Sequence, residues 1–89
     1  VMGHSRCGAV DAAIHDAGHD SIIHITDEIK KAIGAETDPV CCEKKNILYS
    51  MERIKKSPLL QPSIKDGSLK IVGAYYHTRS GEVELLGNE

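Results

Sequence analysis

The repeat of apolar residues changes along the chain, and this change restricts the possible folds most. Up to residue 64 apolar residues recur at spacings of three and four, which is typical of helices that bury one face. Residues 69–76 are instead rich in strand formers, and residues 82–86 can return as a second strand after a turn at 79–81. Residues 1–3 are predicted to end a further strand, and a strand that returns to a neighbour through helices must run parallel to it. The pattern therefore predicts an α/β fold, with a small, mostly parallel sheet, covering helices and a C-terminal hairpin.

Two helices are predicted in the first part of the chain. An alanine-rich segment over residues 7–17 is expected to form a short helix that Gly18 closes. A second helix is expected to follow an N-cap at Asp20 or Ser21 and to end at Gly34. The isoleucines that should form its apolar face are Ile22, Ile25, Ile29 and Ile33.

Asp38-Pro39 is the clearest helix start in the sequence, because an N-cap acceptor is followed by proline at the first helical position. This third helix is expected to stop near Ser57-Pro58. A short extra helical turn is predicted around Leu59, Leu60 and Ile64, before Asp66-Gly67. The apolar side of the third helix should carry Val40, Ile47, Met51 and Ile54.

Composition excludes two classes of protein. The 89 residues carry 11 Lys and Arg against 13 Asp and Glu, a formal charge of −2, so the basic surface of a nucleic-acid-binding protein is missing. No apolar run approaches the ~20 residues of a membrane span. We expect one domain over residues 1–89. Its two or three strands need more covering than this chain contains, which favours association with further chain.

The cysteines Cys7, Cys41 and Cys42 form an odd set with an adjacent pair, which favours reduced thiols in a cytoplasmic protein over a disulfide scaffold. Such thiols serve as metal ligands or as small buried apolar groups. For the adjacent pair we favour one side chain packed inward and one partly exposed. Metal binding or a redox role is the alternative, but neighbouring side chains on a helix diverge by about 100°.

The segment GHSRCGAV, residues 3–10, carries the chemistry. His4 and Cys7 lie three residues apart at a predicted strand-to-helix turn, where both side chains can face one point. Imidazole nitrogen and thiolate sulfur are good zinc ligands, and Gly3 and Gly8 would allow a tight turn beside the metal. Taken alone, the spacing also fits a buried cysteine beside a polar loop histidine.

Four segments resemble the β-class carbonic anhydrases. VMGHSRCGAV at residues 1–10 resembles the family's second zinc motif, G-H-x-x-C-G-A, and residues 46–60 are similar to its helix ending in S-P-x-L. GSLKIVGAYY at residues 67–76 resembles its G-x-L-x-I-x-G-A-x-Y strand, and SGEV at residues 80–83 resembles its T-G-x-V hairpin. The resemblance covers essentially the whole chain, in the family's order, and corresponds to the C-terminal half of that fold.

This resemblance implies an α/β sheet, a zinc site of two cysteines and one histidine, and reversible hydration of carbon dioxide to bicarbonate. His4 and Cys7 match the family's histidine and second cysteine. The activity would require Zn²⁺, and the protein would be a cytoplasmic homo-oligomer. The residues that support the metal-binding loop would be Gly3, Ser5, Gly8 and Ala9.

The family's first zinc motif, C-x-D-x-R, does not occur in residues 1–89, so we expect a chain truncated at its N-terminus. The Asp–Arg pair that orients the zinc-bound water is part of that motif, so catalytic residues stay unassigned. The third ligand could come from a missing N-terminal half, from another subunit or from a rearranged cysteine. Two alternatives stay open: a related carbonyl sulfide or carbon disulfide hydrolase, and an inactive half-domain that serves oligomerisation or metal binding.

The remaining polar residues are interpreted as surface groups. The histidines His15, His19 and His24 suggest a metal cluster, but solvated side chains are favoured. His77 is expected at the surface after a strand. The run at 43–45, Glu-Lys-Lys, is predicted to be a solvated helix face. Arg6 lies between the two predicted ligands and is expected either to influence an anion near zinc or to face solvent.

Overall fold

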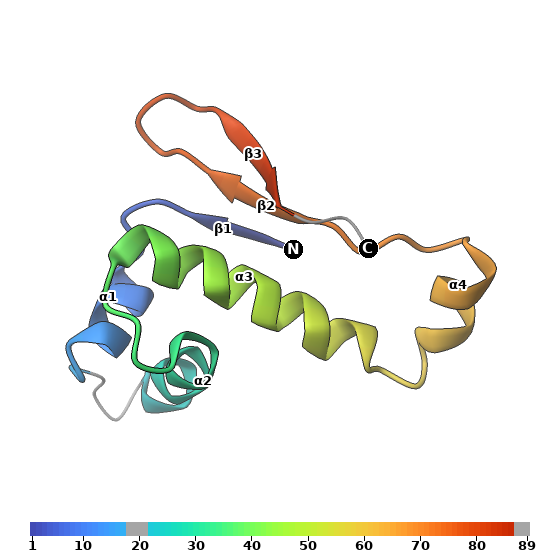
Figure 1. The fold of residues 1–89 in the computed structure, drawn as a ribbon, viewed down its shortest axis with the longest axis horizontal. Coiled ribbons are helices and arrows are strands. Elements are labelled where there is room, and N and C mark those ends of the chain that lie inside the picture. The colour runs from blue at the N-terminus through green and yellow to red at the C-terminus, as the bar shows by residue number, and fades with distance from the viewer. Residues whose placement is uncertain (18–21, 87–89) are drawn as a thin grey trace.

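A computed structural model describes residues 1–17 and 22–86. In Figure 1 the long helix α3 runs through the middle of the molecule, with the sheet on one side and α1 and α2 on the other. The predicted order of strand, helices and two strands is confirmed. The elements are β1 (Met2–His4), α1 (Gly8–Ile14), α2 (Ile23–Ile33), α3 (Pro39–Lys55), α4 (Gln61–Asp66), β2 (Gly73–Tyr76) and β3 (Val83–Leu86).

The described strands form one sheet in the order β1-β2-β3. β1 runs parallel to β2, with Met2 opposite Ala74, and β3 runs antiparallel to β2. The predicted crossover and hairpin are both confirmed. Gly81, at φ 79°, allows the hairpin turn, and its N–H donates to the His77 carbonyl at 2.8 Å. β2 is shorter than the predicted strand over residues 69–76, because pairing begins only at Gly73.

α3 begins as predicted, since the Asp38 side chain accepts a hydrogen bond from the Cys41 N–H at 2.9 Å. Ile47 and Met51 are buried on its sheet side, as expected. Val40 is 48% exposed, contrary to the prediction.

The apolar face of α2 differs from the prediction by one position. Ile29 and Ile33 are buried, but Ile25 is 54% exposed and Thr26 is fully buried in its place. Thr26 tolerates burial because its hydroxyl donates back to the carbonyls of the preceding turn, at 3.1 Å for Ile23. A polar residue with a local acceptor thus occupies the buried position that the isoleucine spacing assigned to the preceding residue, Ile25.

The ends of α1 and α2 are described only in part. The expected capping residues Gly18, Asp20 and Ser21 lie outside the described residues. α1 ends at Ile14, earlier than the predicted Ala17. The backbone turns left-handed at Asp16, with φ 53°, and this conformation is incompatible with a continued helix.

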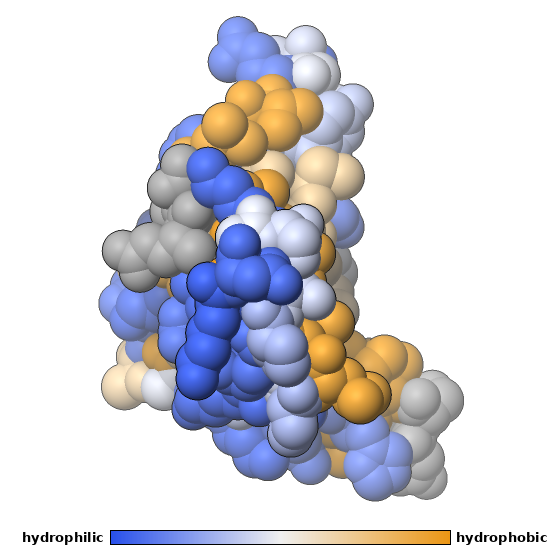
Figure 2. All heavy atoms as spheres, turned by 90° about the vertical axis from the view of Figure 1, so that its right-hand side faces the viewer, coloured by the Kyte–Doolittle hydropathy of each residue, from blue (hydrophilic) through white to orange (hydrophobic). Residues whose placement is uncertain are grey.

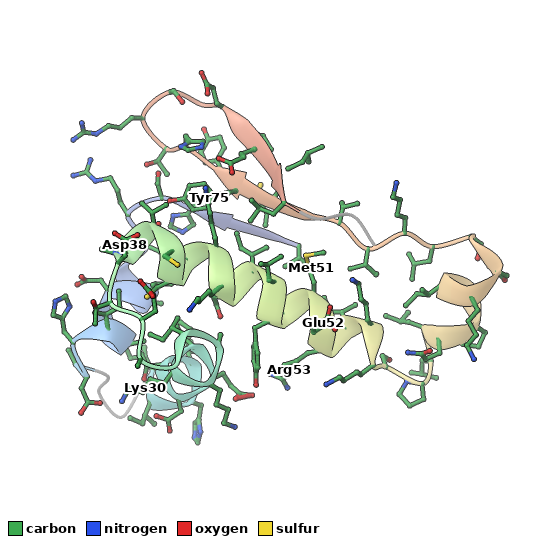
Figure 3. All side chains as sticks on the ribbon, in the orientation of Figure 1. Lys30, Asp38, Met51, Glu52, Arg53 and Tyr75 are labelled. Atoms are coloured by element: carbon green, nitrogen blue, oxygen red, sulfur yellow. The ribbon has the colours of Figure 1, made fainter. Side chains whose placement is uncertain are left out.

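The core consists of two clusters that meet along α3. One joins α1, α2 and the start of α3: Val10, Ala13, Ile29, Ile33 and Cys42. The other joins α3 to the sheet: Ile47, Met51, Ile71 and Tyr75. Figure 3 shows Tyr75 between the sheet and α3, with Met51 further along the same helix. The second cluster packs α3 against β2, and its Ile47 also lies close to Gly3 of β1.

Candidate functional site

His4 ends β1 and is exposed. Its Nδ1 lies 2.9 Å from the carbonyl oxygen of Ser5. A carbonyl can only accept, so in this contact Nδ1 carries the hydrogen, and Nε2 of the neutral ring keeps its lone pair. A histidine held at one nitrogen by a carbonyl is the usual arrangement for a metal ligand that binds through the other.

Cys7 follows three residues later at the N-cap position of α1, with an extended backbone. Its side chain is half-buried and its thiol is free. The Cys7 N–H donates to Oε2 of Glu43 on α3, at 3.0 Å. The cysteine is therefore held at its backbone, and its sulfur is not used in a disulfide.

The loop between the two predicted ligands turns at Arg6, whose φ is 57°. The expectation that Gly8 permits this turn is wrong, because Gly8 is the first residue of α1 and has open space around it. Gly3 is needed for a different reason: a Cβ there would lie 2.8 Å from the Ile47 side chain. Ala9 is half-buried and packs against the first core cluster.

Ser5 attaches this loop to the hairpin. The Ser5 N–H donates to the carbonyl of Tyr76 at 2.9 Å, which extends the β1–β2 pairing by one bond. The Ser5 hydroxyl accepts from the Thr78 N–H at 2.9 Å and lies 2.9 Å from the Thr78 hydroxyl. The predicted supporting role of Ser5 thus corresponds to contacts with residues more than 70 positions away.

Both predicted ligands line one cleft of about 220 Å³, so the fold brings His4 and Cys7 to the same space. The other residues that line this cleft are Met2, Gly3, Val10, Glu43 and Asn46. A second cleft, of about 350 Å³, includes Arg6, Asp11 and Pro39. Cys7 and Glu43 line both clefts.

Glu43 was predicted to face solvent, and this prediction is wrong: the residue is 5% exposed. Its Oε2 accepts from Cys7, and its Oε1 accepts from the Tyr75 hydroxyl at 2.5 Å. Burial, reinforced by the hydrogen bond to this carboxylate, raises the pKa of Tyr75, which therefore stays a neutral donor. One sequence signal was available, because Glu43 lies four residues before Ile47 and eight before Met51, on the same helix face.

A second set of polar side chains, those of Lys44, His77 and Glu84, lies near the Tyr75 ring. Lys44 lies 5.2 Å above the ring centre and pairs with Glu84 on β3 at 3.0 Å. His77, expected at the surface, is half-buried: its ring meets Tyr75 edge-on at 5.0 Å and its Nε2 lies 3.3 Å from Glu84. The hydrogen bonds from Lys44 and His77 lower the pKa of Glu84.

The adjacent cysteines pack as expected, with Cys42 fully buried and Cys41 half-buried. The Cys42 thiol donates to the Glu36 carbonyl at 3.3 Å, and burial raises its pKa. His15 and His24 are exposed, while His19 lies outside the described residues. Within residues 1–17 and 22–86, no group of three or more His, Cys, Asp or Glu side chains is placed to hold a metal ion.

The donors present fit zinc in kind but are too few. Imidazole and thiolate suit Zn²⁺, and His4 has its free nitrogen set by a hydrogen bond. A catalytic zinc site needs three protein ligands and one open position, however, and the described residues bring only two such donors to the cleft.

The described helices also include none long and apolar enough to cross a membrane.

Comparison with known proteins identifies related chains. The sequence model of a family described as "Carbonic anhydrase" matches residues 1–83. Beta carbonic anhydrase 5, chloroplastic, from Arabidopsis thaliana is 35% identical over 86% of this chain and 30% of its own length. A solved structure of the beta-carbonic anhydrase CcaA superimposes with a TM-score of 0.69 and 18% identity, over 100% of this chain and 50% of that one. The chain thus spans half or less of these relatives, and the last comparison confirms the α/β fold alone.

Proposed function

This chain belongs to the β-carbonic anhydrase family, and on that premise we propose that its His4 and Cys7 bind zinc in a centre that reversibly hydrates carbon dioxide to bicarbonate. Family membership supports a carbonic anhydrase-type function. The observation that carries the proposal is that both residues line one cleft, while the Ser5 carbonyl lies 2.9 Å from Nδ1 of His4 and leaves Nε2 free.

Zinc bound there would lower the pKa of a coordinated water towards about 7 and so supply hydroxide at neutral pH. The chain's own contribution is the placement of donors. The Ser5 carbonyl orients the imidazole of His4, and the contacts of Ser5 with Tyr76 and Thr78 keep the loop on the sheet. Glu43 holds the backbone of Cys7.

We propose that the third zinc ligand lies outside residues 1–89, either in a preceding part of the same polypeptide or in another subunit of a cytoplasmic homo-oligomer. The chain would then be one domain that completes its site with this further chain. Cys42 is a poor substitute, because its thiol is buried and bonded to the Glu36 carbonyl. The catalytic Asp–Arg pair expected in the family would be supplied with the missing ligand.

Zinc content of protein purified without added metal tests this proposal, together with stopped-flow carbon dioxide hydration. About one zinc per chain and a rate above buffer are expected if the site is completed as proposed. Cys7→Ser should abolish tight zinc binding, because a hydroxyl is a much weaker ligand than a thiolate. Unchanged zinc occupancy in Cys7→Ser, with Cys41→Ser as the matched control, would overturn the ligand assignment.

One observation favours a second candidate, an inactive half-domain that acts through association. Met2, Val83 and Leu85 expose apolar side chains on the face of the sheet opposite α3. This candidate predicts an oligomer without hydration activity.

Carbonyl sulfide and carbon disulfide are alternative substrates of the same zinc chemistry. Turnover of either compound in place of carbon dioxide would identify that variant of the enzyme.

A further inference from the structure

Glu43 and Thr26 are the buried polar residues among the described part of the chain. Thr26 bonds within its own helix, so its burial is a local matter. Glu43 has no local partner of this kind. A buried carboxylate is costly unless donors satisfy its oxygens, and both donors for Glu43 come from other elements.

One of the two donors precedes Glu43 in the sequence, and the other follows it. The Cys7 N–H comes from the loop before α1, 36 positions earlier, and the Tyr75 hydroxyl comes from β2, 32 positions later. An N-terminal helix N–H has no partner within its own helix, so the Cys7 N–H requires an outside acceptor. Glu43 provides it at 3.0 Å.

The position of the carboxylate is itself well defined. One turn after Glu43 on α3, Ile47 packs so closely against β1 that Gly3 has no room for a Cβ. The Tyr75 hydroxyl, in a fully buried residue, holds the second carboxylate oxygen at 2.5 Å. The acceptor for Cys7 is thereby fixed relative to both β1, which carries His4, and β2.

We propose that Glu43 is a positioning residue for the metal-binding loop: it orients the backbone of Cys7 so that the thiol shares the cleft with His4. This inference rests on the proposed zinc centre and deepens it. The described residues place no cation in an ion pair with Glu43, because Lys44 on the next position pairs with Glu84 instead. The role is therefore one of hydrogen-bond geometry, and an uncharged side chain of the same shape can fulfil it.

Two substitutions of Glu43 test whether the loop depends on the hydrogen-bond geometry of this side chain. Glu43→Ala removes both acceptors. Glu43→Gln keeps one oxygen for the Cys7 N–H and offers its NH₂ group to the Tyr75 hydroxyl oxygen, so it should restore the loop. Glu52→Gln, an exposed position on the same helix, is the matched control, and Ile33→Val in the other core cluster controls for a general loss of stability.

The full 89-residue chain is titrated with Zn²⁺ against a competing chelator, and exchange of the Cys7 amide is followed by NMR without metal. Glu43→Ala should weaken zinc binding by about 10–100-fold, the usual effect of losing a group that supports a ligand. It should also speed exchange of the Cys7 amide. Glu43→Gln should recover most of both properties, and Glu52→Gln and Ile33→Val should leave zinc affinity unchanged.

The outcomes separate this inference from the proposed function. Zinc binding that survives both His4→Ala and Cys7→Ser would overturn the proposed contribution of this chain to a metal centre. If the 89 residues alone bind no zinc, which is consistent with a third ligand outside them, the exchange of the Cys7 amide still decides whether Glu43 holds the loop. Zinc binding that depends on His4 and Cys7 but equals the wild-type value in Glu43→Ala would overturn the positioning role alone. A Glu43→Gln variant as impaired as Glu43→Ala would overturn the geometric account.

Discussion

The two faces of the small sheet are built in opposite ways. The inner face packs on α3, and it does so through Gly3, Gly73 and the fully buried Tyr75. The outer face presents Met2, Val83 and Leu85, which are 66%, 57% and 75% exposed. Figure 2 shows apolar side chains at the surface near the top of the view, at the height of the hairpin. The register explains the separation, because Met2, Ala74 and Leu85 lie in one row across the strands.

This comparison shows that the close packing of the inner face and the apolar side chains of the outer face serve separate purposes. Small residues on the inner face let α3 approach the strands, and that approach brings Glu43 to Tyr75 and Cys7. The outer face is apolar but has no covering helix among the described residues (Figure 1). We therefore expect changes on the inner face to affect stability and the site, and changes on the outer face to affect association.

The largest effect is expected from Gly73→Ala on the inner face. A Cβ at this position would lie 2.5 Å from the Met51 sulfur and 3.1 Å from the backbone oxygen of Leu86. Overpacking of this kind costs about 1–3 kcal/mol of unfolding free energy, measured by urea denaturation. Gly8→Ala is the control, since open space surrounds that position and alanine favours a helix; equal losses in both variants would contradict the close approach.

A smaller effect on stability, but a clear one on association, is expected from Leu85→Lys on the outer face. An exposed position away from the core changes the unfolding free energy by less than about 0.5 kcal/mol. The added charge should nevertheless weaken contact of this face with any apolar partner. Sedimentation velocity measures the change, and an unaltered oligomer distribution would show that the outer face takes no part in assembly.

The smallest effect concerns Glu84, at the edge of the inner face. Its pKa is lowered from 4.5 by the hydrogen bonds from Lys44 and His77, so the ionised form stabilises the fold. This contribution is fully present above the ordinary pKa and is lost as the pH falls through the lowered value of the folded state. Urea denaturation of wild type and Glu84→Gln should therefore differ at neutral pH and converge in acid. A difference that grows on acidification would refute the assignment.

Much of the fold was predictable because its causes are local. Asp38-Pro39 starts α3 through a hydrogen bond three residues away, and the hairpin turn needs the left-handed φ that Gly81 adopts. The parallel pairing of β1 and β2 follows from the crossover between them. The motif at His4 and Cys7 predicted that the two side chains can face one point, and both residues line one cleft.

The errors concern which side chains are buried. Ile25 and Val40 fit the apolar spacing but are exposed, and Thr26 is buried because a local acceptor satisfies its hydroxyl. Glu43 belonged to a charged run that is usually solvated. Its burial depends on an N–H and a hydroxyl that lie more than 30 residues away in the sequence, and no local pattern predicts these contacts.

By itself, the sequence determined the order of the elements, the start of α3, the hairpin and the pair of candidate zinc ligands, since each follows from residues close together in the chain or from backbone geometry. Only the tertiary structure decided that a glutamate supports Cys7, and that one face of the sheet is closed while the other is open. Packing brings together groups that are remote in sequence, and the free energy of a buried carboxylate depends on which donors arrive there.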